Sequence, residues 1–95
     1  MELDGTPVIG RVPVVVTVVQ GEGGAPVEGG QVRIHGDMSH AGMEPVIRDA
    51  VETGPGRYVA EDFEFTMGGD WIVSAQVTLP DGESTEVTAF YDVGR

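Results

Sequence analysis

The chain of 95 residues contains no cysteine and no lysine. Without cysteine it has neither disulfides nor thiolate metal ligands, so a chain of this length must fold around one modest core without cross-links. The chain has five arginines and sixteen carboxylates, which gives a net charge of −11. Nucleic acids and anionic membranes are bound by clustered lysine and arginine, so the composition argues against both partners.

Long hydrophobic runs are also missing. The apolar stretch at 12–19 contains Pro13 and is far shorter than the roughly 20 residues of a membrane span. It therefore predicts a buried strand, and no membrane span is expected in this chain. The first residues lack the basic region and cleavage site of a secretory signal. We expect a mature domain from an exported or membrane-anchored protein.

No segment shows the 3.6-residue period of an amphipathic helix. Fifteen glycines and frequent valines, with turn signals about every ten residues, are typical of an all-β sandwich or barrel. We predict one immunoglobulin-like β-sandwich domain over residues 1–95, with about seven antiparallel strands. These strands are expected near 7–9, 12–20, 31–36, 46–51, 57–65, 71–79 and 84–93.

Two strands carry specific expectations. In 71–79 apolar residues alternate from Trp71 onward, which places Trp71 in the core. In 57–65 the parity of Tyr58 differs from that of Phe63, which predicts a β-bulge near Glu61 and Asp62. Tyr58 is expected to bury its ring and to hydrogen-bond through its hydroxyl near a corner of the fold.

The residues between 35 and 43 are the only ones that point to chemistry. This segment holds both histidines of the chain, His35 and His40, and two of the three internal methionines, Met38 and Met43. Imidazole and thioether are borderline to soft donors that suit Cu(I) better than Mg²⁺, Ca²⁺ or Mn²⁺. Zinc rarely accepts thioethers, and no calcium-loop spacing occurs. The segment therefore predicts a copper site.

A loop over 37–45 would let these donors converge. In an antiparallel order, the loop at 66–70 emerges at the same end of the fold, so Met67 becomes a candidate fifth ligand. His35 is either a ligand or a cap at the solvent end of its strand. Asp37 and Glu44 are hard donors, and we expect them to orient an imidazole or to help hold Cu(II).

Catalytic motifs have little support. Ser39, His40 and Asp37 have the residue types of a nucleophilic triad, but they are sequence neighbours in an expected loop, without a rigidly held base. The glycine-rich stretch at 21–30 lacks the Lys and Ser or Thr of a phosphate-binding loop. We therefore expect a protein that is not an enzyme.

Several segments together resemble the YtkA-like family and the related FixH-like domains, over residues 22–93. The resemblance is carried by 25–32 (Ala-Pro-Val-Glu-Gly-Gly-Gln-Val), Met-Ser-His at 38–40, Met-Glu-Pro at 43–45, Gly-Arg-Tyr at 56–58, and Phe-Thr-Met-Gly-Gly-Asp-Trp-Ile-Val at 65–73.

The resemblance implies a small extracytoplasmic β-sandwich, often membrane-tethered, that is associated with copper handling or respiratory oxidase assembly. The family's Met/His loop would correspond to Met38, His40 and Met43, with Met67 from the segment that bears the tryptophan. The chain departs from the family by having His-Gly-Asp before Met38, where a Met-Pro start is more usual. This departure leaves the role of His35 open.

Two interpretations follow. The leading one is a periplasmic or extracellular protein that holds Cu(I) on its Met/His loop for delivery, storage or resistance. Its partner would be a copper-donating or copper-accepting protein, in the setting of oxidase assembly if the resemblance extends that far. The alternative is a structural or interaction module of a larger surface or membrane protein, in which the loop has no metal role.

Overall fold

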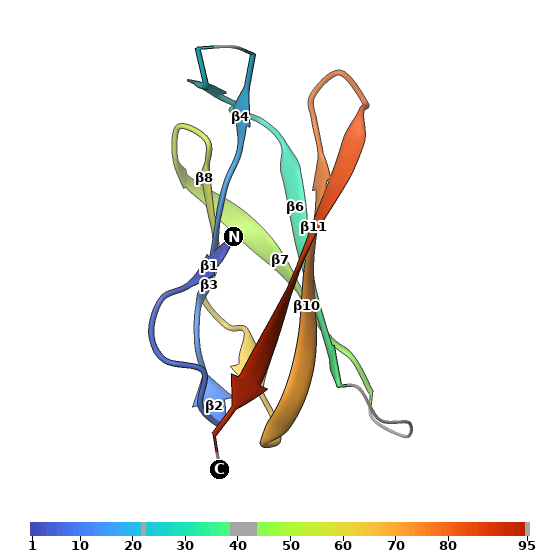
Figure 1. Ribbon diagram of the computed structural model, residues 1–95. Coiled ribbons are helices and arrows are strands. Elements are labelled where there is room, and N and C mark those ends of the chain that lie inside the picture. The colour runs from blue at the N-terminus through green and yellow to red at the C-terminus, as the bar shows by residue number, and fades with distance from the viewer. Residues whose placement is uncertain (22, 39–43, 95) are drawn as a thin grey trace.

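A computed structural model describes residues 1–21, 23–38 and 44–94, and these residues form strands, turns and bends without a helix (Figure 1). Seven strands form one antiparallel sheet in the order β1-β3-β8-β7-β6-β10-β11, while β2 pairs with β9 and β4 pairs with β5. The strands are β1 (Glu2–Leu3), β2 (Gly10–Arg11), β3 (Val14–Thr17), β4 (Val19–Gln20), β5 (Ala25–Pro26), β6 (Gln31–Met38), β7 (Val46–Gly54), β8 (Arg57–Ala60), β9 (Glu64–Phe65), β10 (Gly69–Thr78) and β11 (Ser84–Val93). The all-β prediction is confirmed.

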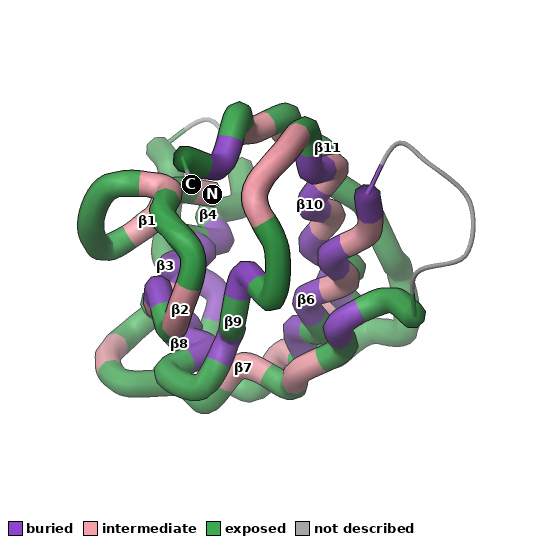
Figure 2. The backbone as a smooth tube through the Cα atoms, turned by 90° about the horizontal axis from the view of Figure 1, so that it is seen from below, coloured by how far each residue is buried: buried purple, intermediate pink, exposed green. Residues whose placement is uncertain are grey.

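Strand β7 turns the sheet into two facing layers. Its first half, from Val46 to Ala50, pairs with β6, whereas Val51 and Glu52 pair with β8. The register shifts between Glu52 and Gly54 at the end of this strand. In Figure 2, β1, β3 and β8 lie on one side, β6, β10 and β11 lie on the other, and β7 joins them. The sheet is thus curled into a half-barrel, consistent with the predicted sandwich.

The core lies between these layers and follows the two-residue period of the strands. In β10, Trp71 and the alternate apolar residues after it are buried, as the sequence predicts. In β6, Val32, Ile34, Gly36 and Met38 face inward. Side chains of successive strand residues point to opposite faces, so the residues between them lie on the outer face.

The expected strand at 57–65 is instead two strands with different partners. β8 ends at Ala60 and pairs with β3, the chain turns at Glu61 and Asp62, and β9 pairs with β2. The predicted bulge is therefore wrong, although the change in parity is real. Phe63 and Phe65 face inward because the chain leaves one sheet and enters another at this point.

Other boundaries differ at prolines. The expected strand at 7–9 is absent from the described residues, where Val8 makes only a single bridge to Gly94. The stretch at 12–20 is divided into β3 and β4, with β3 beginning just after Pro13, which has no N–H to donate to a ladder. Strand β6 runs on to Met38, two residues beyond the expected end at 36.

Tyr58 fixes one corner of the fold, as predicted. Its ring is buried and its hydroxyl donates a hydrogen bond of 2.8 Å to the Val27 carbonyl. The same hydroxyl accepts a hydrogen bond of 2.9 Å from the Gly30 N–H. The described part of the chain offers no helix with the length and apolar character to cross a membrane.

Candidate metal centre

Met38 is the last residue of β6 and lies directly opposite Trp71 in β10. Its side chain is 6% exposed and belongs to the hydrophobic core. The methyl end of the thioether lies against Gly69, where an added Cβ would sit 2.8 Å from Met38 Cε. Gly69 also has a φ of +133°, so both its backbone and the methionine require a residue without a side chain there.

Met67 lies just before β10, and its side chain is 48% exposed. Its carbonyl accepts a hydrogen bond of 2.9 Å from Trp71 Nε1, so the indole holds the segment that enters β10. Because Trp71 is the cross-strand partner of Met38, this contact ties the Met67 segment to the end of β6. The structure therefore brings Met38 and Met67 to the same end of the sheet, as the loop argument predicts.

His35 lies three residues before Met38 on the other face of the sheet. It is half-buried, and its cross-strand neighbours are Ser74 in β10 and Ile47 in β7. Because β6 stays extended through Met38, the two side chains point to opposite faces. His40 and Met43 lie outside the described residues. Of the five predicted ligands, Met38 and Met67 thus belong to segments at one end of the sheet, and His35 points to the other face.

The hard donors next to this end are occupied locally or exposed. Asp37 Oδ1 accepts a hydrogen bond of 2.8 Å from the Met38 N–H, and Glu44 is exposed. Across 1–21, 23–38 and 44–94, no group of three His, Cys, Asp or Glu residues is arranged to hold a metal ion.

Aromatic rings form the floor beneath the two methionine segments. Phe65 packs edge-on against Phe63 and Trp71, with ring centroids 5.3 Å and 5.2 Å apart. Tyr91 completes the cluster, with its ring centroid 6.3 Å from that of Phe65. Burial raises the pKa of Tyr91, and the nearby carboxylate of Glu2 raises it further. Phe63, Phe65 and Trp71 are fully buried, so this end of the core is apolar.

Sequence reasoning did not identify Gly36 and Gly69 as residues that shape this end. An added Cβ on Gly36 would lie 2.5 Å from Phe63 Cζ, so this glycine lets the aromatic floor pack against β6. The Gly68-Gly69 pair before Trp71 was a signal in the sequence for a close approach at that point. The Phe63 contact comes from a distant segment and left no local signal.

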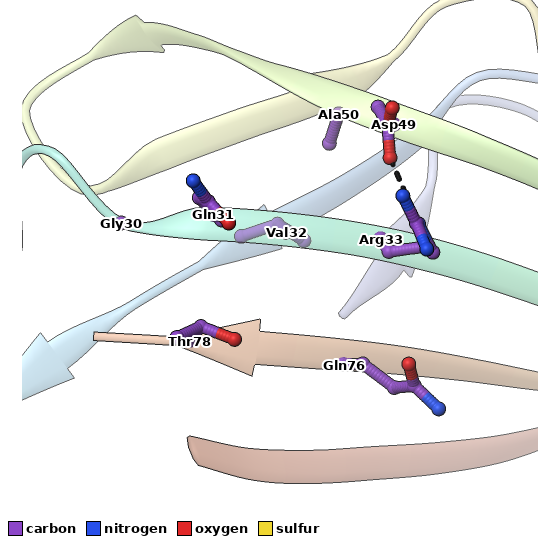
Figure 3. Close-up of a pocket in the computed structure, with 8 residues that line it drawn as sticks. All are labelled: Gly30, Gln31, Val32, Arg33, Asp49, Ala50, Gln76 and Thr78. Atoms are coloured by element: carbon purple, nitrogen blue, oxygen red, sulfur yellow. Dashed lines mark hydrogen bonds and ion pairs between the residues drawn. The ribbon is translucent and has the colours of Figure 1, made fainter. Parts of the chain in front are cut away.

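A separate hollow lies on the outer face of the sheet (Figure 3). It has a volume of about 490 Å³ and is lined by β6, β7 and β10. Its charged groups are Arg33 and Asp49, whose Nε and Oδ1 atoms form an exposed ion pair of 3.0 Å. None of the predicted ligands lines this hollow, so it is distinct from the candidate metal centre.

Fold and site together define a small all-β domain with a methionine-bearing end above an aromatic floor. Comparison with protein families matches residues 1–76 to the YtkA-like family, and the chain belongs to that family. The match runs from the first residue into β10, so it begins earlier and ends earlier than the resemblance at 22–93. No curated protein and no solved structure gives a match.

Proposed function

We propose that this chain is an extracytoplasmic Cu(I)-binding protein, periplasmic or extracellular, that holds copper for delivery, storage or resistance. The ligands would be Met38, His40, Met43 and Met67. The observation that carries the proposal is the pairing of Met38 with Trp71, whose indole binds the Met67 carbonyl. This pairing puts two methionine-bearing segments at one end of the sheet, and thioethers are ligands that select Cu(I).

Copper is cargo in this proposal, and the protein acts by ligand exchange rather than by catalysis. Met67 is half exposed and would meet the incoming ion first, whereas Met38 is buried and would swing outward from Gly69. Methionine has three rotatable side-chain bonds, so this movement requires no backbone change. A partner protein with its own soft ligands would then take the ion as donors are released one at a time.

An anaerobic Cu(I) titration against a chromophoric chelator tests the proposal. The wild type should bind one copper ion, and Met38→Leu or Met67→Leu should weaken binding by about tenfold or more, because each removes a soft donor. Leucine matches methionine closely in volume, so Met38→Leu should keep the fold. His35→Gln, on the other face of the sheet, is the matched control and should bind as the wild type does.

The pH dependence separates the imidazole from the thioethers. Imidazole must be neutral to bind a metal, whereas thioethers do not titrate. Affinity should therefore fall as the pH drops below about 6.5, where an ordinary imidazole gains its proton. His40→Gln should remove this dependence. A wild-type affinity that stays constant from neutral to acid pH would exclude histidine from the site.

A second candidate function, a structural or interaction module without a metal, has one observation in its favour. Met38 is 6% exposed and belongs to the hydrophobic core, as a methionine that only fills space would. This alternative predicts that Met38→Leu combined with His40→Gln changes neither metal content nor partner binding. A wild type that fails to compete with the chelator for Cu(I) would favour it.

A further inference from the structure

Strand β11 is an open edge of the sheet. Its ten residues pair with β10 in one uninterrupted register, from Ser84 opposite Thr78 to Val93 opposite Gly69. Within the described ranges, β10 is the only strand with which it forms a ladder. Prolines, bulges and inward-facing charges protect edge strands, and β11 has none of these; its two charged residues, Glu86 and Asp92, lie on the outer face. Such an edge can accept a further strand.

The backbone groups that face the open side can be assigned. Leu79 N–H donates a hydrogen bond of 2.7 Å to the Glu83 carbonyl, and bonded pairs alternate with non-bonded pairs along an antiparallel ladder. The odd-numbered residues of β11 therefore bond to β10, and the even-numbered ones face outward. Gly94 fits this series, because its N–H donates to the Pro7 carbonyl at 3.2 Å. The chain thus covers its own edge at Gly94.

An exposed aromatic ring marks the uncovered part of this edge. Phe90 is 76% exposed, the most of any large apolar residue in the described chain, and it lies opposite Ile72 on the outer face. The two residues border an open hollow of about 460 Å³. A strand added next to β11 would place a side chain within contact distance of the Phe90 ring.

The negative charge around Phe90 and Ile72 favours a basic partner. Asp70 and Asp92 lie directly opposite each other, and Asp37 is the neighbour of Ile72 on the β6 side. In the part of the chain that the structure describes, none of these three carboxylates forms an ion pair. Each chain also carries a net charge of −11, which disfavours addition of a second copy.

We propose that the open edge of β11 docks an extended segment of a basic partner protein. The segment would add as a strand along the backbone of Glu86, Thr88 and Phe90, with an apolar side chain on Phe90. Its lysine or arginine side chains would lie beside Asp92 and extend toward Asp70, one strand further into the sheet. Backbone bonds would supply affinity and alternate side chains would supply specificity, as in other strand additions. This proposal is independent of copper binding.

Capped synthetic peptides of the same length test the wild-type protein without metal. A lysine–valine peptide that repeats Lys-Thr-Val-Thr, so that lysine and valine alternate along one face of the strand, should bind and slow amide hydrogen exchange at Glu86, Thr88 and Phe90 (measured by NMR). A lysine–valine peptide methylated at alternate backbone nitrogens and a glutamate–valine peptide should both fail. Binding by the glutamate–valine peptide, or binding without protection of these amides, would overturn the proposal.

Variants separate the backbone contribution from the charge contribution. Thr88→Pro removes an N–H that faces the open side and should abolish binding, while leaving the amides bonded to β10 in place. Ser74→Ala is its matched control, because it removes only the Ser74–Thr88 hydroxyl contact of 3.2 Å and should bind normally. Asp70→Asn with Asp92→Asn should weaken binding about fivefold, as expected for exposed ion pairs.

Sedimentation of the protein alone measures whether a second copy binds the edge instead. A monomer at all concentrations, together with binding of the basic peptide, supports a basic partner. A concentration-dependent dimer that Thr88→Pro dissociates would assign the edge to a second copy and overturn the basic partner. Thr88→Pro that binds the lysine–valine peptide as the wild type does, with its fold intact by NMR, would also overturn the proposal.

Discussion

Among the described glycines, Gly36 leaves the least room for an added Cβ atom. An added Cβ would lie 2.5 Å from Phe63 Cζ and 3.4 Å from the Trp71 ring. Gly36→Ala should therefore lower the free energy of unfolding by about 1–3 kcal/mol, the usual cost of overpacking a core. Gly54→Ala is the control, since no atom lies within 4 Å of its Cβ position and its φ is not positive. Denaturant unfolding that shows equal stability for both variants would contradict this packing.

Tyr91 links the stability of the fold to alkaline pH. Burial raises its pKa above the ordinary value of 10.0, and Glu2 adds to the shift. As the pH rises, the tyrosine therefore loses its proton in the unfolded chain before it does so in the folded protein. The contribution of Tyr91 to stability is complete below about pH 10 and is lost as the pH rises through its pKa in the folded protein. Glu2→Gln should lower the pKa of Tyr91 partway, because burial is the larger cause. Tyrosinate absorbance measures this shift, and Glu28→Gln should cause none.

At the scale of the elements, the alternation of apolar and polar residues predicted the features that depend on residues close together in the sequence. The buried side of β10 follows from the alternation that begins at Trp71, and the corner at Tyr58 follows from its ring and hydroxyl. The break after Ala60 and the switch of β7 between layers were not predictable. Both depend on which distant strand offers a free edge, and a single sequence carries no local signal of that choice.

In the candidate site, too, some features could be predicted from the sequence and others depend on distant residues. The shared end of the Met38 and Met67 segments could be predicted, because reversals in an antiparallel order place alternate loops together. The loop expected from residue 37 begins later, because β6 continues to Met38. That extension places Met38 on the inner face of the sheet, opposite to His35. The Gly68-Gly69 pair signals a close approach, but the residue that approaches, Met38, belongs to another strand and could not be inferred locally.

The pairing of β10 with β11 contains an unfavourable contact. Asp70 and Asp92 are directly opposite on the outer face, and like charges in this arrangement destabilise a sheet. Asp92→Asn should therefore raise the free energy of unfolding by about 0.2–1 kcal/mol at low salt. Glu86→Gln is the control on the same strand face, because Glu86 accepts a hydrogen bond of 3.3 Å from Gln76. Asp92→Asn that lowers stability would mean that this carboxylate has a favourable partner.

For the molecule as a whole, negative charge is in large excess. The net charge is −11, and the described residues form two ion pairs, Arg33–Asp49 and Arg48–Asp62, both at the surface. Exposed pairs of this kind contribute little. Long-range repulsion between like charges opposes the compact state, and salt at about 0.1 M screens it beyond roughly 10 Å.

Added sodium chloride should therefore raise the Tm of this protein, in contrast to proteins in which salt mainly weakens ion pairs. The increase should be steepest below about 0.1 M, where the screening length shortens most. Replacing Glu61 and Glu83 with glutamine removes two negative charges, so this variant should start from a higher Tm and gain less from salt. Calorimetry from low to moderate salt measures both slopes. A Tm that falls with salt in the wild type would show that the two surface pairs outweigh the repulsion.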